Sequence, residues 1–113
     1  MKIVKDKISI EELKKLAEEM FGDLVKAVVD VEEKIMVVGG ELHADEEALL
    51  IKNGSRQSNL WGINIYPENE NEERIEFDSM INLRPSDGNR SRGVENSDTQ
   101  KVIIKVVNNL IEK

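Results

Sequence analysis

The chain has 113 residues, 35% of them charged, no cysteine and a formal net charge of −7. This length predicts one domain over residues 1–113, and the lack of cysteine excludes disulfides and thiolate metal sites. No run of about 18 apolar residues is present and the charged first residues lack a signal segment, so we expect a soluble, cytoplasmic protein without membrane contact.

The first part of the chain predicts a strand, a helix and a β-hairpin. Residues 2–5 form the short strand. Ser9 and Glu12 make a capping box, and apolar residues then recur at helical spacing. Residues 24–31 and 35–39 are rich in Val and Ile and predict the hairpin, although residues 24–31 would also suit an extended helix.

The second part predicts two strands between two helices. Asp45 is suited to cap a short helix over residues 46–53. Residues 60–66 and 75–84 are the clearest strands. A Ser-x-x-Gln capping box then precedes the last helix, over residues 98–112.

These elements predict an α+β domain with an antiparallel-dominated sheet of four to five strands. The first and last helices have wide apolar stripes, so both are expected to pack on the apolar face of the sheet. The short middle helix is expected nearer the rim. The order of the strands does not follow from the sequence.

One face of the two clear strands is predicted to be polar. Side chains alternate along a strand, which places Asn64, Asp78, Asn82 and Arg84 on one face. This is either the solvated face of an ordinary sheet or part of a site; Asn and Asp are poor strand formers, which favours a site. Trp61, the sole tryptophan, is expected in the core, with a stacking platform for a ligand as the alternative.

Residues 84–94 hold three of the five arginines, Arg84, Arg90 and Arg92, with Asn89 beside them. A guanidinium binds carboxylate or phosphate through a planar fork. The acidic net charge disfavours the phosphate backbone of nucleic acids, so the loop suits a small anion better. Surface ion pairs with nearby acids are the structural alternative.

His43 is the only histidine and therefore the only side chain whose ordinary pKa lies near neutrality. It alternates with Glu41 and Asp45, a pattern that suits a divalent cation or an acid/base set. Each of the three also has an ordinary structural role, so we assign no metal and no cofactor. In a catalytic reading His43 is the acid/base and Asp78 its partner.

Several segments together resemble a family of small prokaryotic proteins known only as a domain of unknown function. The resemblance spans most of the chain and implies no activity. It is carried by the segments Gly39–Glu47, Leu60–Pro67, Phe77–Pro85 and Gly88–Val94.

The sequence thus favours a binding module for a small anionic ligand, formed by the arginine loop and the polar strand face. One alternative is a structural or self-associating protein, in which the loop meets the acidic segment Glu68–Glu73 of a second copy. Another is a small hydrolase or nuclease-like enzyme that uses His43. Enzyme status and oligomeric state stay open. The predicted binding residues are Trp61, Asn64, Asn82, Arg84, Asn89, Arg90 and Arg92.

Overall fold

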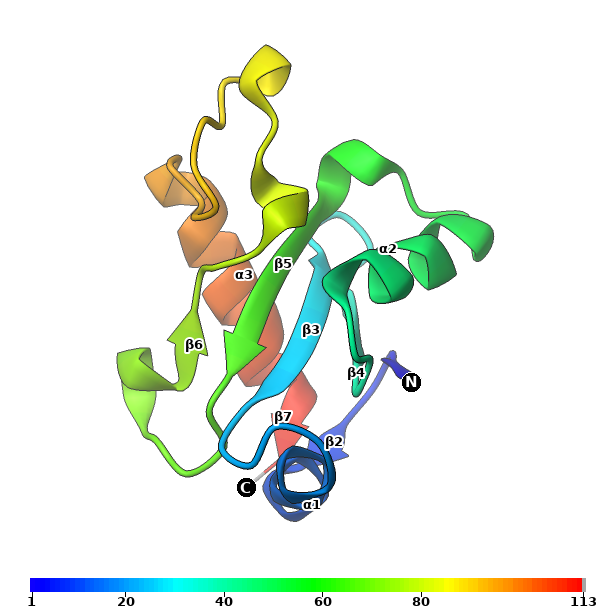
Figure 1. Cartoon of the computed structure of the whole chain (residues 1–113), viewed down its shortest axis with the longest axis vertical. Helices are drawn as coiled ribbons and strands as arrows, with labels where there is room; N and C mark the ends of the chain where they lie inside the picture. Colours follow the sequence, from blue (N-terminus) through cyan, green and yellow to red (C-terminus); the bar gives the residue numbers. More distant parts are fainter. Residues whose placement is uncertain (113) are drawn as a thin grey trace.

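The centre of the sheet is a hairpin of Val-rich strands, whose β-branched side chains favour extended backbone. In the computed structural model, which describes residues 1–112, β3 (Val25–Asp30) pairs antiparallel with β4 (Ile35–Val38). β5 (Leu60–Ile65) pairs with β3, and β1 (Lys2–Val4) pairs with β4. β6 (Ile75–Glu76) completes an antiparallel sheet of order β1-β4-β3-β5-β6 (Figure 1).

Helices cover both faces of this sheet. α1 (Ile10–Glu19) and α3 (Ser97–Leu110) share the larger core with one face, as predicted. α2 (His43–Lys52) packs on the opposite face, so its expected place at the rim is wrong. The reason is that this second face is apolar at its centre, where Val28 and Val37 lie directly opposite each other and bury against Leu50 of α2.

The α+β class and the mostly antiparallel five-stranded sheet are confirmed. The hairpin is confirmed as well, which makes the alternative of a longer helix over residues 24–31 wrong. A short parallel pair, β2 (Ile8–Ser9) with β7 (Ile111–Glu112), was not predicted. Within residues 1–112, no helix combines the length and apolar character needed to span a membrane.

The helix starts agree only in part with the capping patterns. Ser9 caps α1 as predicted, because its hydroxyl accepts from the Glu12 N–H at 3.1 Å. The cap of α3 is Asn96 and the helix begins at Ser97, one residue earlier than predicted. α2 begins at His43, so Asp45 lies in its first turn and is not the cap.

The strand predicted over residues 75–84 ends at Glu76, because a side chain takes over the pairing with β5. The Asn82 amide accepts from the Gly62 N–H at 2.8 Å and donates to the Gly62 carbonyl at 2.9 Å. It therefore offers Gly62 the same donor and acceptor as a neighbouring strand. Gly62 is required here, since a Cβ atom would lie 2.5 Å from Ser79 Oγ.

Asn82 is fully buried and also donates to the Arg92 carbonyl at 2.9 Å. Replacing Asn82 with Ala is expected to lower the free energy of unfolding by about 2–4 kcal/mol, because three bonds are lost and buried backbone groups are left unpaired. Urea denaturation measures this. Asn53→Ala, which removes one exposed bond to Leu49, is the matched control and is expected to change stability by about 0.5 kcal/mol or less. Equal losses in both variants would contradict the role given to Asn82.

Candidate functional site

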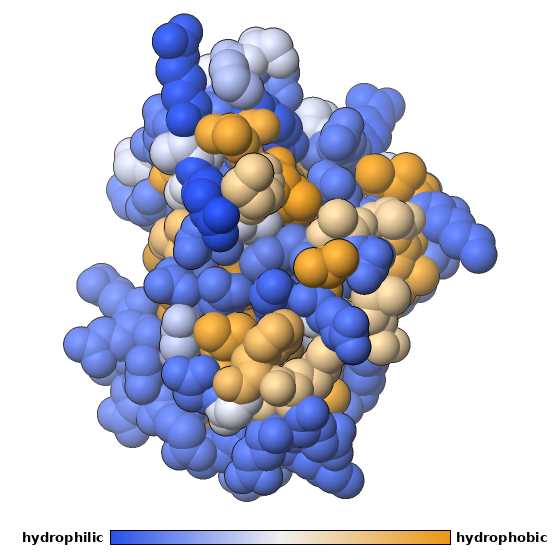
Figure 2. Space-filling model, in the orientation of Figure 1, coloured by the Kyte–Doolittle hydropathy of each residue, from blue (hydrophilic) through white to orange (hydrophobic). Residues whose placement is uncertain are grey.

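α2 covers only part of its sheet face, and the part it leaves open is polar. Strand register aligns Lys26 on β3 with Asn64 on β5, and Asn64 with Glu76 on β6, so the three form one row across the sheet. Alternation along the strands places this row on the α2 side. Figure 2 shows a hydrophilic band between apolar patches on the side of the molecule that carries α2. We call the following residues the polar face: Lys26, His43, Asn64, Tyr66, Glu76, Asp78 and Arg92.

Asn64 has a buried oxygen that lacks a hydrogen-bond donor. Its Nδ2 donates to Glu76 Oε1 at 2.9 Å, and the Tyr66 hydroxyl donates to the same oxygen at 3.0 Å. A carboxylate only accepts, so the amide orientation of Asn64 is fixed and its Oδ1 must point away from Glu76. Asn64 is 8% exposed, and its Oδ1 has no partner in residues 1–112.

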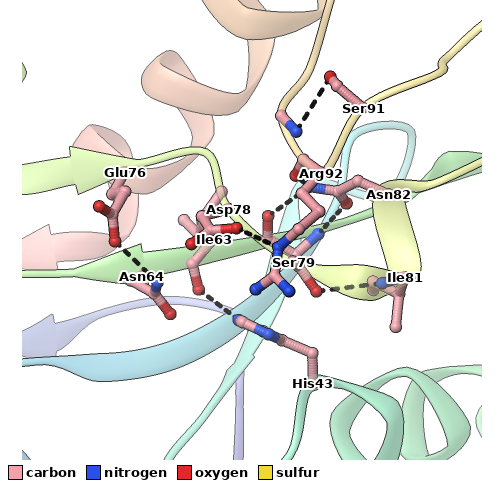
Figure 3. Close-up of polar contacts among 12 residues, drawn as sticks. His43, Ile63, Asn64, Glu76, Asp78, Ser79, Ile81, Asn82, Ser91 and Arg92 are labelled. Atoms are coloured by element: carbon pink, nitrogen blue, oxygen red, sulfur yellow. Dashed lines mark hydrogen bonds and ion pairs between the residues drawn. The ribbon is translucent and has the colours of Figure 1, made fainter.

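His43 lies at the first position of α2 and reaches down to the sheet. Its Nε2 lies 2.7 Å from the Ile63 carbonyl oxygen, which only accepts, so Nε2 carries the proton (Figure 3). Burial lowers the pKa of His43, and the positive charges of Lys26 and Arg92 act in the same direction. The Ile63 carbonyl and Asp78 oppose this. The imidazole is therefore neutral at pH 7, with an unprotonated Nδ1.

Arg92 and Asp78 form an ion pair beside His43. Arg92 Nε donates to Asp78 Oδ1 at 2.6 Å, and both side chains are about half exposed. Figure 3 shows the two terminal guanidinium nitrogens of Arg92 on the side of His43. They make no hydrogen bond or ion pair to the described residues, so they remain available to an anion.

The start of α2 adds unpaired donors to this region. Leu42 occupies the cap position and its side chain cannot accept a hydrogen bond. Within residues 1–112 the backbone N–H groups of His43 and Ala44 have no acceptor. Such groups, together with the helix dipole, favour a negative charge at this end of the helix.

A shallow hollow of about 480 Å³ lies next to the polar face and shares Lys26 with it. The Lys26 ammonium lies 4.9 Å from the centroid of the Phe21 ring. The polar face is therefore bordered by partly exposed apolar side chains. The hollow is lined by Glu19, Met20, Phe21, Lys26, Glu41 and Leu42.

Arg84 does not lie with Arg92; the structure gives it protein partners. Its Nη1 donates to the Gln57 carbonyl at 2.8 Å and its Nη2 to the Leu60 carbonyl at 2.7 Å. The guanidinium also stacks 4.0 Å from the Trp61 ring centroid, and burial lowers the pKa of Arg84. Trp61 packs against the main core on its other side, so its ring is covered by Arg84 and does not form part of the polar face.

The other loop residues are also placed apart from the polar face. Asn82 pairs with Gly62, and the Asn89 amide donates to the carbonyls of Asn82 and Gly93 at 2.7 and 2.8 Å. The side chain of Arg90 is exposed and makes no bond to the described residues. Of the nine residues predicted from the sequence, the polar face brings together His43, Asn64, Asp78 and Arg92.

Two members of the polar face, Lys26 and Glu76, were not among the predicted site residues. Lys26 is the only cation in a strand of mostly buried residues, and this exception in the sequence could have pointed to it. A metal centre receives no support from geometry, since no group of three His, Asp or Glu side chains gathers as ligands in the part of the chain described.

Comparison with known sequences places the chain in a family. The sequence model of the family DUF5674, described as proteins of unknown function, matches residues 2–110. The chain belongs to DUF5674. No curated protein and no solved structure matched the chain. DUF5674 membership confirms the predicted resemblance and assigns no reaction, so the function of this DUF5674 member must be argued from the polar face.

One turn along α2 from His43, Glu46 is a fully buried carboxyl group. Its Oε2 accepts from the Gly40 N–H at 3.0 Å, whereas its Oε1 has no partner in residues 1–112. Burial raises the pKa of Glu46 to about 9, against weaker lowering by the Gly40 N–H, Lys26 and the chain's amino terminus. Glu46 is therefore a neutral carboxylic acid at pH 7.

Glu46→Gln is expected to stabilise the protein at neutral pH. In unfolded chains the Glu46 carboxyl ionises near its ordinary pKa of 4.5, whereas in the folded protein it stays protonated up to about pH 9. The folded state therefore binds one more proton between these values, and its free energy of unfolding falls by up to about 1.4 kcal/mol per pH unit as the pH rises. Gln keeps the shape without ionising, so we expect a gain of about 1–3 kcal/mol at pH 7 and little difference near pH 5.

Urea denaturation from pH 5 to 8.5 measures this difference. Glu18→Gln, an exposed change on α1, is the control and is expected to follow the parent protein. An unchanged pH dependence in Glu46→Gln would show that Glu46 is not buried as a neutral acid.

Proposed function

We propose that this protein binds a small anion, a phosphate or a carboxylate, on the polar face at the start of α2. The observation that carries the proposal is that hydrogen-bond donors without protein partners meet there: the terminal guanidinium nitrogens of Arg92 and the backbone N–H groups of His43 and Ala44, among the described residues. Among the described residues, no carboxylate pairs with Lys26, and Asp78 contacts Arg92 only through Nε. Lys26 thus has no carboxylate partner among the described residues, and Arg92 keeps donors free beside its ion pair with Asp78.

The backbone supports the same ligand. The unpaired N–H groups of His43 and Ala44 are donors at the positive end of α2. A guanidinium and backbone N–H groups together are a common means of holding phosphate or carboxylate oxygens. Of the three arginines of the loop only Arg92 is required, so the proposal keeps the polar strand face and leaves out Arg84 and Arg90.

Binding is favoured over hydrolysis by the partners of His43. A general base in a hydrolase is usually oriented by a carboxylate, but the His43 N–H bonds to the Ile63 carbonyl, and the Asp78 carboxylate bonds to Arg92. We therefore propose a binding module and assign no reaction. The cysteine-free, charge-rich composition favours the cytoplasm as its location.

A titration that follows the imidazole resonances of His43 by NMR tests the proposal, because His43 is the only histidine. Inorganic phosphate or acetate is expected to shift these resonances saturably. Bound negative charge is also expected to raise the pKa of His43, since it opposes the effect of Lys26 and Arg92 on the ring. Arg92→Ala and Lys26→Ala are each expected to weaken binding about tenfold.

Arg56→Ala is the matched control, because Arg56 is exposed and lies outside the polar face. Its affinity for phosphate is expected to equal that of the parent protein. The proposal is overturned if neither anion shifts the His43 resonances saturably, or if Arg92→Ala, Lys26→Ala and Arg56→Ala all bind as the parent does.

A further inference from the structure

The charge on the polar face changes from positive on β3 to negative on β6. Its row begins with the ammonium of Lys26, continues with the amide of Asn64 and ends with the carboxylate of Glu76. Neighbouring strands lie about 4.8 Å apart, so the Cα atoms of Lys26 and Glu76 are about 10 Å apart across the row. A small molecule that lies along this row therefore meets a positive end and a negative end.

The middle of the row lacks a hydrogen-bond donor. Asn64 Oδ1 is buried and unpartnered, and its direction is fixed by the bond from Nδ2 to Glu76. A buried acceptor left without a donor destabilises the folded protein. Figure 3 shows Asn64 and His43 on the same side of β5, with the Asn64 oxygen directed away from Glu76. A ligand held at the start of α2 would supply the missing donor if its second end carried one.

The charge around Asn64 favours a cationic donor over a hydroxyl. Glu76 Oε1 already accepts two hydrogen bonds, but its Oε2 makes none to the described residues. An ammonium group donates up to three hydrogen bonds and carries the charge that complements Glu76. A hydroxyl would satisfy Asn64 Oδ1 and leave the carboxylate charge unmatched.

We propose that the ligand is a small zwitterion, an acid whose other end carries an ammonium group. Its anionic end binds Lys26, Arg92 and the N–H groups at the start of α2. Its ammonium end donates to Asn64 Oδ1 and faces Glu76. This inference rests on the proposed function, because it takes the anion site as its first anchor.

The experiment compares matched pairs of compounds that differ only in an ammonium against a methyl group. β-Alanine is compared with butyrate, and 2-aminoethylphosphonate with propylphosphonate, by NMR titration of the parent protein. The member with the ammonium is expected to bind at least about tenfold more tightly in one pair or both. Equal affinities in both pairs overturn the zwitterion inference.

Two variants test whether Asn64 and Glu76 cause the preference for the ammonium compound. Asn64→Leu keeps the side-chain volume, removes the acceptor and is expected to reduce the preference for the ammonium compound to about threefold or less. Glu76→Gln, an exposed change, keeps hydrogen-bonding atoms but removes the charge and is expected to reduce the preference as well. Both keep Lys26, Arg92 and the N–H groups at the start of α2, so inorganic phosphate is still expected to shift the His43 resonances saturably in each. If Asn64→Leu does not fold, Glu76→Gln decides the outcome, and an unchanged preference in Glu76→Gln overturns the inference.

The two proposals fail in different ways. If phosphate, acetate and all four compounds fail to shift His43, the anion site itself is absent. If phosphate binds but each matched pair binds equally, the anion site stands and the zwitterion does not. If the preference exists but survives in both variants, the ammonium binds elsewhere and the role given to Asn64 and Glu76 is wrong.

Discussion

The pairing of one side-chain amide with one glycine controls the edge of the sheet. By matching both backbone groups of Gly62, Asn82 replaces the strand that would otherwise continue beside β5. The chain is then released from the sheet after Glu76 and folds back over its edge. The Arg92 carbonyl is held by both the Asn82 amide and the Ser79 N–H, which fixes Arg92 next to Asp78. Arg92, one of the two cations of the polar face, is thus positioned by hydrogen bonds from Asn82 and Ser79.

The start of α2 concentrates features that work against stability. Glu46 is kept neutral by burial, Asn64 has an acceptor without a donor, and Leu42 occupies a position where a capping side chain would stabilise the helix. In natural proteins, helix capping, packing and hydrogen bonding favour the native fold at most positions, and the exceptions tend to lie at functional sites. Three departures within one region support the proposal that this end of the sheet is a binding site.

Local patterns in the sequence predicted most of the fold, but not the roles of its asparagines. The hairpin, the Ser9 cap and the alternation that places Asn64 on a polar face all depend on neighbouring residues, and the structure has them. Asn82 and Arg84 were placed on that face because the strand was assumed to continue. Their actual partners, Gly62 and Trp61, lie about 20 residues away in the sequence, beyond the reach of periodicity. Lys26 was overlooked for a similar reason, since only the strand register reveals that it faces Asn64.

Because Arg84 stacks on Trp61, the fluorescence of this tryptophan depends on the position of the loop that carries Arg84. Trp61 is the only tryptophan, so the intrinsic fluorescence of the chain comes from an indole whose exposed side is covered by one guanidinium. Arg84 donates to the carbonyls of Gln57, before β5, and Leu60, the first residue of β5, and its backbone N–H donates to the Asn89 carbonyl. Any detachment of that loop would therefore uncover the indole and change its emission, even while the rest of the sheet stays intact.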